Sequence, residues 1–99
     1  MSYWFHPDAE SEFNQAVDYY EEIETGLGYD FAIEVYATIQ RSFIYPNAWP
    51  VLEADIRRCL VRRFPYGVLY SIVPNGLFIL AIMNLHRDPD YWKHRRSDK

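Results

Sequence analysis

The second half of the sequence carries cationic and titratable side chains at spacings that could serve phosphodiester chemistry. The set contains two adjacent arginine pairs, a histidine, another arginine and a tyrosine: Arg57-Arg58, Arg62-Arg63, His86, Arg87 and Tyr91. Arginine stays charged at any working pH and holds phosphate oxygens through two parallel hydrogen bonds. Histidine titrates near neutral pH. These residue types therefore fit RNA cleavage by attack of a 2′-hydroxyl on the adjacent phosphate.

In such a site, arginines would stabilise the pentacoordinate phosphate while a histidine or tyrosine handles the protons. The candidate catalytic residues are Arg58, Arg62, His86, Arg87 and Tyr91. A structural interpretation competes with each role. Arginines on a half-exposed strand are often solvated or paired with nearby acids such as Glu53 and Asp55, and His86 could simply hydrogen-bond the backbone. The sequence has no metal-ligand spacing, phosphate-binding glycine loop or Ser/His/Asp set, so we expect neither a metal nor a cofactor.

The two arginine pairs must be positioned by the segment around them. Its β-branched and aromatic content favours a strand over residues 55–64. Because side chains alternate along a strand, each pair supplies one arginine to each face. Arg58 and Arg62 would then share a face with Ile56, and we expect that face of the sheet to be partly open.

Two further strands are predicted over residues 67–73 and 77–86, with a tight Pro-Asn-Gly turn between them. The second run is almost wholly hydrophobic, so it belongs at the centre of a sheet with both faces covered. If this strand continues regularly, Asn84 and His86 lie on one face. A short apolar stretch at residues 2–5 could add a fourth strand.

Upstream of these strands, apolar residues recur at helical spacing near residues 7–25 and 29–45. Pro7 suits a first helical turn, and glycines end the first segment. Since the connection is short, the helices should form an antiparallel hairpin. We predict a single α+β domain over residues 1–99, with an N-terminal strand and the hairpin packed on a small twisted antiparallel sheet.

The two halves of the sequence carry opposite charge. Residues 1–50 hold nine acids and one base, and residues 51–99 hold nine bases and five acids, which gives −8 and +4 within a total of −4. This asymmetry indicates two surfaces with different partners. An acidic helix face that only confers solubility would give the same pattern.

Composition also bounds the cellular context. The single cysteine, Cys59, cannot form an internal disulfide or a cysteine-rich zinc site. No apolar run approaches the ~20 residues of a membrane-spanning helix. The first residues lack the basic start and apolar stretch of a signal peptide. We therefore expect a cytoplasmic protein without a membrane partner.

Nearly the whole chain resembles toxins of the RelE/ParE family, the plasmid-stabilisation type. Two stretches carry most of the likeness: IRRCLVRRFPYGVLY at residues 56–70 and AIMNLHRDPDYW at residues 81–92. The opening HPDAE at residues 6–10 and YYE at residues 19–21 fit the family too, and the likeness covers residues 3–95. The family fold, a helical hairpin against a small twisted antiparallel sheet, agrees with the predicted order of elements.

The resemblance implies the toxin component of a bacterial type II toxin–antitoxin system, a growth inhibitor neutralised by a cognate antitoxin. RelE-like members are metal-independent endoribonucleases that cut messenger RNA on the ribosome. ParE-like members inhibit DNA gyrase and are not nucleases. An inactive relative that only binds an antitoxin is a third alternative.

Two features favour the ParE-like action on gyrase over the nuclease. Related sequences often carry a histidine where Asn84 stands, although His86 could substitute for it. RelE-like nucleases are usually strongly basic, whereas this chain has a pI near 5.2 and would approach a polyanion against its own negative field.

The antitoxin would need an apolar and cationic track on the toxin. A disordered segment that folds on binding would place an amphipathic helix on apolar residues of the hairpin and carboxylates against strand arginines. The candidate antitoxin-binding residues are Tyr20, Ile23, Leu27, Arg58 and Arg62.

Overall fold

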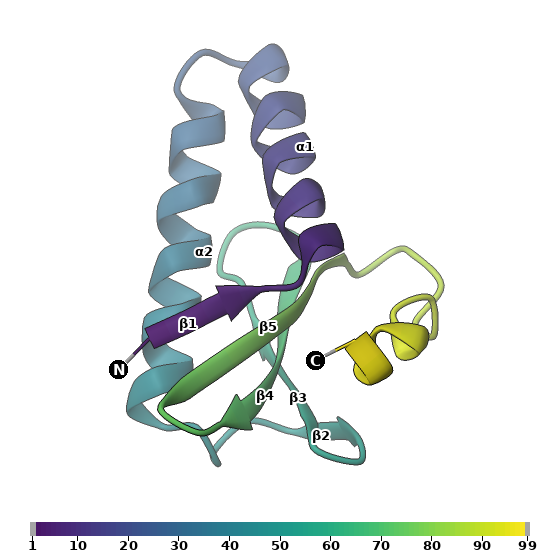
Figure 1. The fold of residues 1–99 in the computed structure, drawn as a ribbon. Helices are drawn as coiled ribbons and strands as arrows, with labels where there is room; N and C mark the ends of the chain where they lie inside the picture. The colour runs from purple at the N-terminus through teal and green to yellow at the C-terminus, as the bar shows by residue number, and fades with distance from the viewer. Residues whose placement is uncertain (1, 99) are drawn as a thin grey trace.

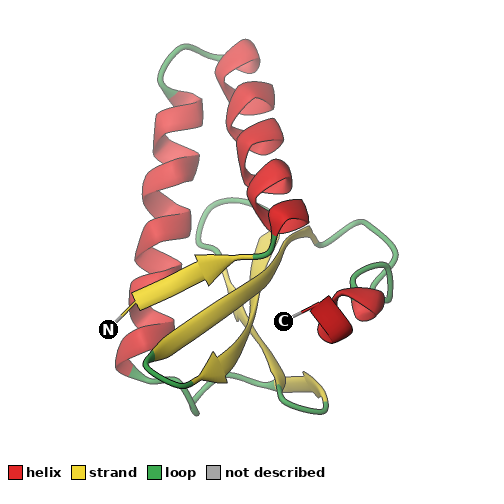
Figure 2. Ribbon diagram, in the orientation of Figure 1, coloured by secondary structure: helices red, strands yellow, loops and turns green. Residues whose placement is uncertain are grey.

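The computed structural model, which describes residues 2–98, has a helical hairpin lying against a five-stranded sheet (Figure 1, Figure 2). Along the chain the elements are β1 (Ser2–Phe5), α1 (Pro7–Ile23), α2 (Leu27–Ile44), β2 (Val51–Glu53), β3 (Ile56–Leu60), β4 (Tyr66–Val73), β5 (Gly76–Asn84) and a 3-10 helix, η1 (Lys93–Asp98). The strand order is β1-β5-β4-β3-β2. The predicted α+β class is confirmed. Neither helix of the hairpin is long and apolar enough to cross a membrane.

The sheet is mixed: the three predicted neighbouring strands pair antiparallel as expected, and one pairing, that of β1, is parallel. β1 runs parallel to β5, with Ser2 opposite Gly76 and Phe5 opposite Ile79. The other three pairings are antiparallel. The apolar β5 gains a neighbour on each edge in this way, as a central strand requires. The direction of β1 could not be read from its own four residues, because its partner lies at the other end of the chain.

The strand predicted over residues 55–64 ends at Leu60. Beyond it the backbone turns, with Arg63 at a φ of 72° and the N–H of Val61 donating to the carbonyl of Tyr66 at 2.9 Å. Phe64 lies on the face of the sheet that the hairpin covers, and its ring centroid is 5.2 Å from that of Phe31. The alternation of faces therefore holds from Ile56 to Leu60 and fails after it.

The turn of the hairpin is specified by one carboxylate and two glycines. Glu21 accepts hydrogen bonds from the N–H of Gly26 at 2.9 Å and of Gly28 at 3.0 Å. Gly26 has a φ of 91°, the left-handed region that glycine enters without strain. A Cβ on Gly28 would lie 2.5 Å from the carbonyl oxygen of Val17, so the close approach of the helices requires glycine there.

Both faces of the sheet are covered, which corrects the expectation of a partly open face. On one face the hairpin packs over the strands. On the other face Trp92, 1% exposed, packs against a second apolar cluster of strand residues: Ile56, Leu69, Leu80, Ala81 and Met83. An irregularity in the β4–β5 register between Leu69 and Tyr70 leaves Leu80 without an opposite residue, so Leu80 and Ala81 both join this cluster. The segment after β5 thus packs against this face of the sheet and brings η1 beside it.

Candidate functional site

The fold divides the arginines into two groups with different surroundings. The first group, which we call the tail clamp, consists of Glu12, Arg87, Tyr91 and Arg95. The guanidinium of Arg95, with a side chain only 6% exposed, donates to both carboxylate oxygens of Glu12 at 2.9 and 3.1 Å. Arg95 also donates to the carbonyl of Leu80 at 3.2 Å. These contacts hold the end of the chain against α1 and β5.

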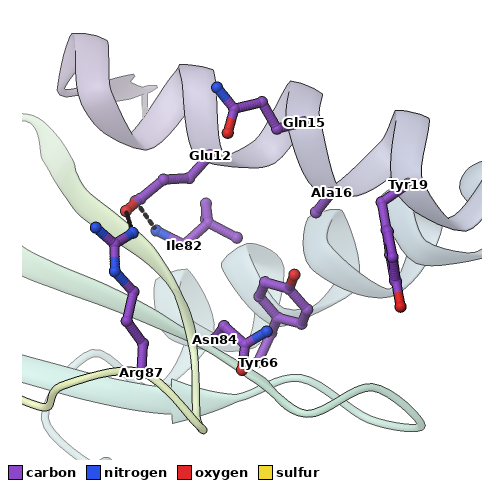
Figure 3. Close-up of a pocket in the computed structure, with 8 residues that line it drawn as sticks. All are labelled: Glu12, Gln15, Ala16, Tyr19, Tyr66, Ile82, Asn84 and Arg87. Atoms are coloured by element: carbon purple, nitrogen blue, oxygen red, sulfur yellow. Dashed lines mark hydrogen bonds and ion pairs between the residues drawn. The ribbon is translucent and has the colours of Figure 1, made fainter.

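Glu12 connects the tail clamp to the sheet. Its Oε1 accepts the backbone N–H of Ile82 at 3.1 Å, and its Oε2 lies 3.5 Å from Nη1 of Arg87. Figure 3 shows the Glu12 carboxylate between these two groups. The Glu12 side chain, only 13% exposed, thus contacts two guanidinium groups and a backbone N–H. Glu12 is therefore a structural residue, and sequence periodicity gave no sign of this role.

Two of the candidate catalytic residues belong to the tail clamp. The guanidinium of Arg87 lies 3.8 Å from the ring centroid of Tyr91. Burial, and then the neighbouring Glu12 carboxylate, raise the pKa of the Tyr91 hydroxyl well above its ordinary value. A tyrosine held protonated in this way is a poor general base, because deprotonation would create an unfavourable buried charge.

A polar hollow of about 310 Å³ opens beside the clamp, between α1 and the ends of β4 and β5. Its lining residues are Glu12, Gln15, Ala16, Tyr19, Tyr66, Ile82, Asn84 and Arg87 (Figure 3). Burial raises the pKa of the Tyr66 hydroxyl, which a hydrogen bond with Asn84 partly offsets. Of the sequence-predicted catalytic residues, Arg87 alone lines this hollow.

His86 does not share a strand face with Asn84, contrary to the expectation for a regular strand. β5 ends at Asn84, and the backbone N–H of His86 donates to Oδ1 of Asn84 at 2.9 Å. This contact closes a turn of the kind that asparagine favours. His86 is exposed in that turn, and it is not among the residues that line the polar hollow.

The second group lies at the edge of β3, in what we call the arginine hollow. It has a volume of about 230 Å³ and is lined by Arg41, Trp49, Pro50, Arg58, Cys59, Leu60 and Arg62. Nη2 of Arg41 donates to Oγ1 of Thr38 at 3.0 Å and to the carbonyl of Leu60 at 3.3 Å. Among the side chains that the structure describes, those of residues 2–96, the guanidinium groups of Arg58 and Arg62 find no hydrogen-bond or ion-pair partner.

The other arginine of each sequence pair, Arg57 or Arg63, contacts the protein itself. Nη1 of Arg57 donates to the carbonyls of Asn47 and Trp49 at 3.1 and 2.7 Å, which fixes the loop before β2. Arg63 lies 3.6 Å from Asp30. The alternation predicted for β3 therefore separates Arg57 from Arg58 as expected. The arginine hollow adds Arg41, which the sequence analysis did not single out although it is the only base in the first half of the chain.

The predicted antitoxin-binding residues of the hairpin differ in how exposed they are. Tyr20 belongs to the aromatic core, with its ring centroid 5.2 Å from Phe31 and 4.9 Å from Phe64. Leu27 packs partly buried against the same core, whereas Ile23 is 58% exposed. An exposed stripe on α2 was missed: Tyr29, Ile33 and Tyr36, at helical spacing.

The five candidate catalytic residues are not assembled into one site. Arg87 and Tyr91 lie in the tail clamp, Arg58 and Arg62 line the arginine hollow, and His86 lies in a turn beside Asn84. Within the part of the chain that the structure describes, no three histidine, cysteine, aspartate or glutamate residues are grouped to hold a metal ion. Chemically, the arginine hollow offers cations to an anionic ligand, and the tail clamp offers mainly stability.

Comparison with known proteins identifies the fold. No protein-family model matches the sequence, and no curated protein is detectably similar to it. Among solved structures, a chain from the chromosomal ParDE TA system from P. aeruginosa matches with a TM-score of 0.73 and 16% sequence identity. The match covers 86% of this chain and 96% of that chain. The fold predicted from the resemblance to RelE/ParE toxins is therefore confirmed.

Proposed function

We propose that this protein is the toxin component of a type II toxin–antitoxin system and that it arrests growth by binding a protein target, DNA gyrase being the leading candidate. The observation that carries the proposal is the fold shared with a chain of a ParDE TA system across 96% of that chain. The resemblance of residues 56–70 and 81–92 to RelE/ParE toxins supports the same assignment from the sequence.

The choice of a protein target over RNA is supported by the tail clamp. General acid–base catalysis needs a proton-transferring group within hydrogen-bond reach of the reacting atoms. The hydroxyl of Tyr91 is buried, its pKa is raised by burial and by Glu12, and Arg87 is paired with Glu12. A toxin that works by occupying a surface of its target does not need these groups to be free.

Neutralisation by an antitoxin is part of the proposal. The exposed side chain of Ile23 and the unpaired guanidinium groups of Arg58 and Arg62 supply the apolar and cationic contacts that an acidic, folding segment would use. Tyr20 and Leu27 would support this surface from the core beneath it.

Growth arrest on induction in a bacterial host tests the toxin assignment. We expect cells to stop growing when this chain is expressed, and to recover when the product of the neighbouring short reading frame is expressed with it. Continued growth in the presence of soluble, folded protein would reject an active toxin and leave an inactive antitoxin-binding relative.

A metal-independent messenger RNA endoribonuclease is the second candidate, and the unpaired arginines Arg58 and Arg62 favour it. Primer extension on messenger RNA from a translating extract separates the two functions. We expect no ordered cuts within codons. Cuts that disappear in both His86→Ala and Arg62→Ala would establish the nuclease in place of the gyrase inhibitor.

A further inference from the structure

The arginine hollow brings three cations to one small apolar recess. Arg58 and Arg62 reach it from β3 and the turn after it, and Arg41 reaches it from the end of α2. We propose that this hollow is an anchor site for an acidic peptide segment, and that it binds a carboxylate next to an apolar side chain. The inference rests on the proposed function, because the antitoxin is the partner that would supply such a segment.

The lack of partners for Arg58 and Arg62 is selective. The chain has fourteen acids and ten lysines and arginines, so intramolecular partners are not scarce. The six other arginines do have partners among the described residues: Arg41, Arg57, Arg63, Arg87, Arg95 and Arg96. The seven residues that line the hollow include no acid. A carboxylate from another molecule would therefore meet no repulsion from the lining.

Hydrogen bonds hold one of these three cations in place, whereas the stem of Arg58 packs across Gly67 of β4. Arg41 is fixed by its hydrogen bonds to Thr38 and to the carbonyl of Leu60. Cations that are positioned before binding lose less side-chain entropy when the ligand arrives.

Trp49 contributes an aromatic ring to the lining of the hollow. Its indole Nε1 is buried from solvent and has no hydrogen-bond partner among the residues described. This N–H therefore does not face the opening of the hollow, but its resonance can report a change at the ring that does.

The edge of β3 offers an apolar contact beside the arginines. β2 pairs with β3 opposite Ile56 and Arg57, and beyond it the N–H of Arg58 donates to the carbonyl of Pro50 at 3.0 Å while the carbonyl of Leu60 accepts from Arg41 at 3.3 Å. These backbone groups already have partners, but the side chain of Leu60 is 51% exposed. A peptide could place an apolar side chain on Leu60 and a carboxylate among the arginines.

Size and charge favour a peptide side chain over a nucleotide. The volume of about 230 Å³ is below the roughly 300–1,000 Å³ of ordinary small-molecule pockets. A nucleic acid would also approach a chain with a net charge of −4, and repulsion of a polyanion acts over a Debye length of about 8–10 Å at ordinary salt. A short acidic segment brings less charge and fewer atoms to accommodate.

Fluorescence anisotropy of the full chain with a labelled peptide tests the anchor. The probe is a short peptide of glutamates and leucines separated by serines, and its matched control has glutamine in place of every glutamate. We expect the glutamate peptide to bind, and the Arg58→Gln/Arg62→Gln variant to bind it at least about tenfold more weakly. Arg63→Gln, which removes a charge outside the hollow, should leave the affinity unchanged.

An NMR titration of the same peptide locates the binding. The indole N–H resonance of Trp49, assigned with Trp49→Phe, should move with the glutamate peptide and not with the glutamine peptide. Three results would each overturn the anchor. The glutamate peptide does not bind, the glutamate and glutamine peptides bind equally, or Arg63→Gln loses as much affinity as Arg58→Gln/Arg62→Gln. Tighter binding of a short oligouridylate at the same residues would replace the peptide with RNA. Growth arrest that persists with no peptide binding rejects the anchor alone, whereas peptide binding without growth arrest rejects the proposed toxin.

Discussion

The tail clamp and the arginine hollow use the same residue type for different purposes. In the tail clamp, Arg95 is buried and bound by both oxygens of Glu12. In the arginine hollow, Arg62 is exposed and Arg58 is half-buried, and neither has a partner among the described side chains. A buried arginine must be paired, because an unpaired buried charge costs several kcal/mol. An arginine that is accessible to solvent needs no intramolecular partner and can bind a ligand. The presence or absence of a carboxylate partner therefore distinguishes the structural arginines from those available for binding.

The largest expected effect comes from breaking the tail clamp. We predict that Arg95→Met lowers the free energy of unfolding by about 3 kcal/mol, because it leaves the Glu12 carboxylate without its main partner. Urea denaturation followed by circular dichroism measures this change. Arg62→Met is the matched control and should stay within about 0.5 kcal/mol of the parent. Similar losses in both variants would remove the distinction between the two groups.

The next effect concerns binding at the arginine hollow. We predict that Arg58→Glu/Arg62→Glu weakens antitoxin binding by about a hundredfold, because two charge-assisted contacts are lost and two repulsions are introduced. Isothermal titration at low and high salt gives the affinity. Arg63→Glu, next to Arg62 but facing Asp30, should change it little. An unchanged affinity of the double variant at both salt concentrations, with the fold intact, would mean that the antitoxin uses the hairpin alone.

Tyr91→Phe tests whether the tail clamp has a catalytic role. The hydroxyl is buried without a hydrogen-bond partner in the described structure, and its pKa is raised by burial and by Glu12. We predict that growth arrest by this variant equals that of the parent protein in an induction assay. Loss of toxicity with unchanged unfolding stability would return Tyr91 to the list of catalytic groups.

The smallest effect is a pH dependence of the attachment of η1. Hydrogen bonding from Lys93, and next its ion pairing together with that of Arg96, hold the pKa of Glu53 below its ordinary value of 4.5. A carboxylate with a lowered pKa contributes stability above the unfolded-state pKa, and this contribution is lost as the pH falls through the folded-state value. We predict that the parent protein loses more stability than Glu53→Gln between pH 6 and about pH 3, as measured by thermal melts. Parallel pH profiles would show that the contact with Glu53 contributes nothing.

Local patterns in the sequence predicted the elements that depend on neighbours in the chain. Helical spacing, the glycine turn and the alternation from Ile56 to Leu60 predicted the hairpin and separated Arg57 from Arg58 correctly. The early ends of β3 and β5 are local failures, and the others involve contacts between distant segments. Pairing of β1 with β5, the packing of Trp92 on the sheet and the bond between Arg95 and Glu12 join residues far apart in sequence. No periodicity within one segment could reveal them.

For the candidate site too, the sequence predicted the residue types but not their tertiary neighbours. The strand arginines were identified by type and spacing, but the end of β3 at Leu60 moved Arg62 off the strand. Arg41 and Trp49 come from elements that the spacing argument did not connect with β3. The pairing state of each arginine depends on where distant acids lie, which is a tertiary property.

A supercoiling assay with purified DNA gyrase tests the central claim, that this protein acts on a protein target, most directly. We predict that excess protein inhibits supercoiling of relaxed plasmid DNA and produces a gyrase-dependent cleavage complex. Addition of the antitoxin should relieve the inhibition. Undisturbed supercoiling with no cleavage complex, from a preparation that arrests growth, would contradict the account.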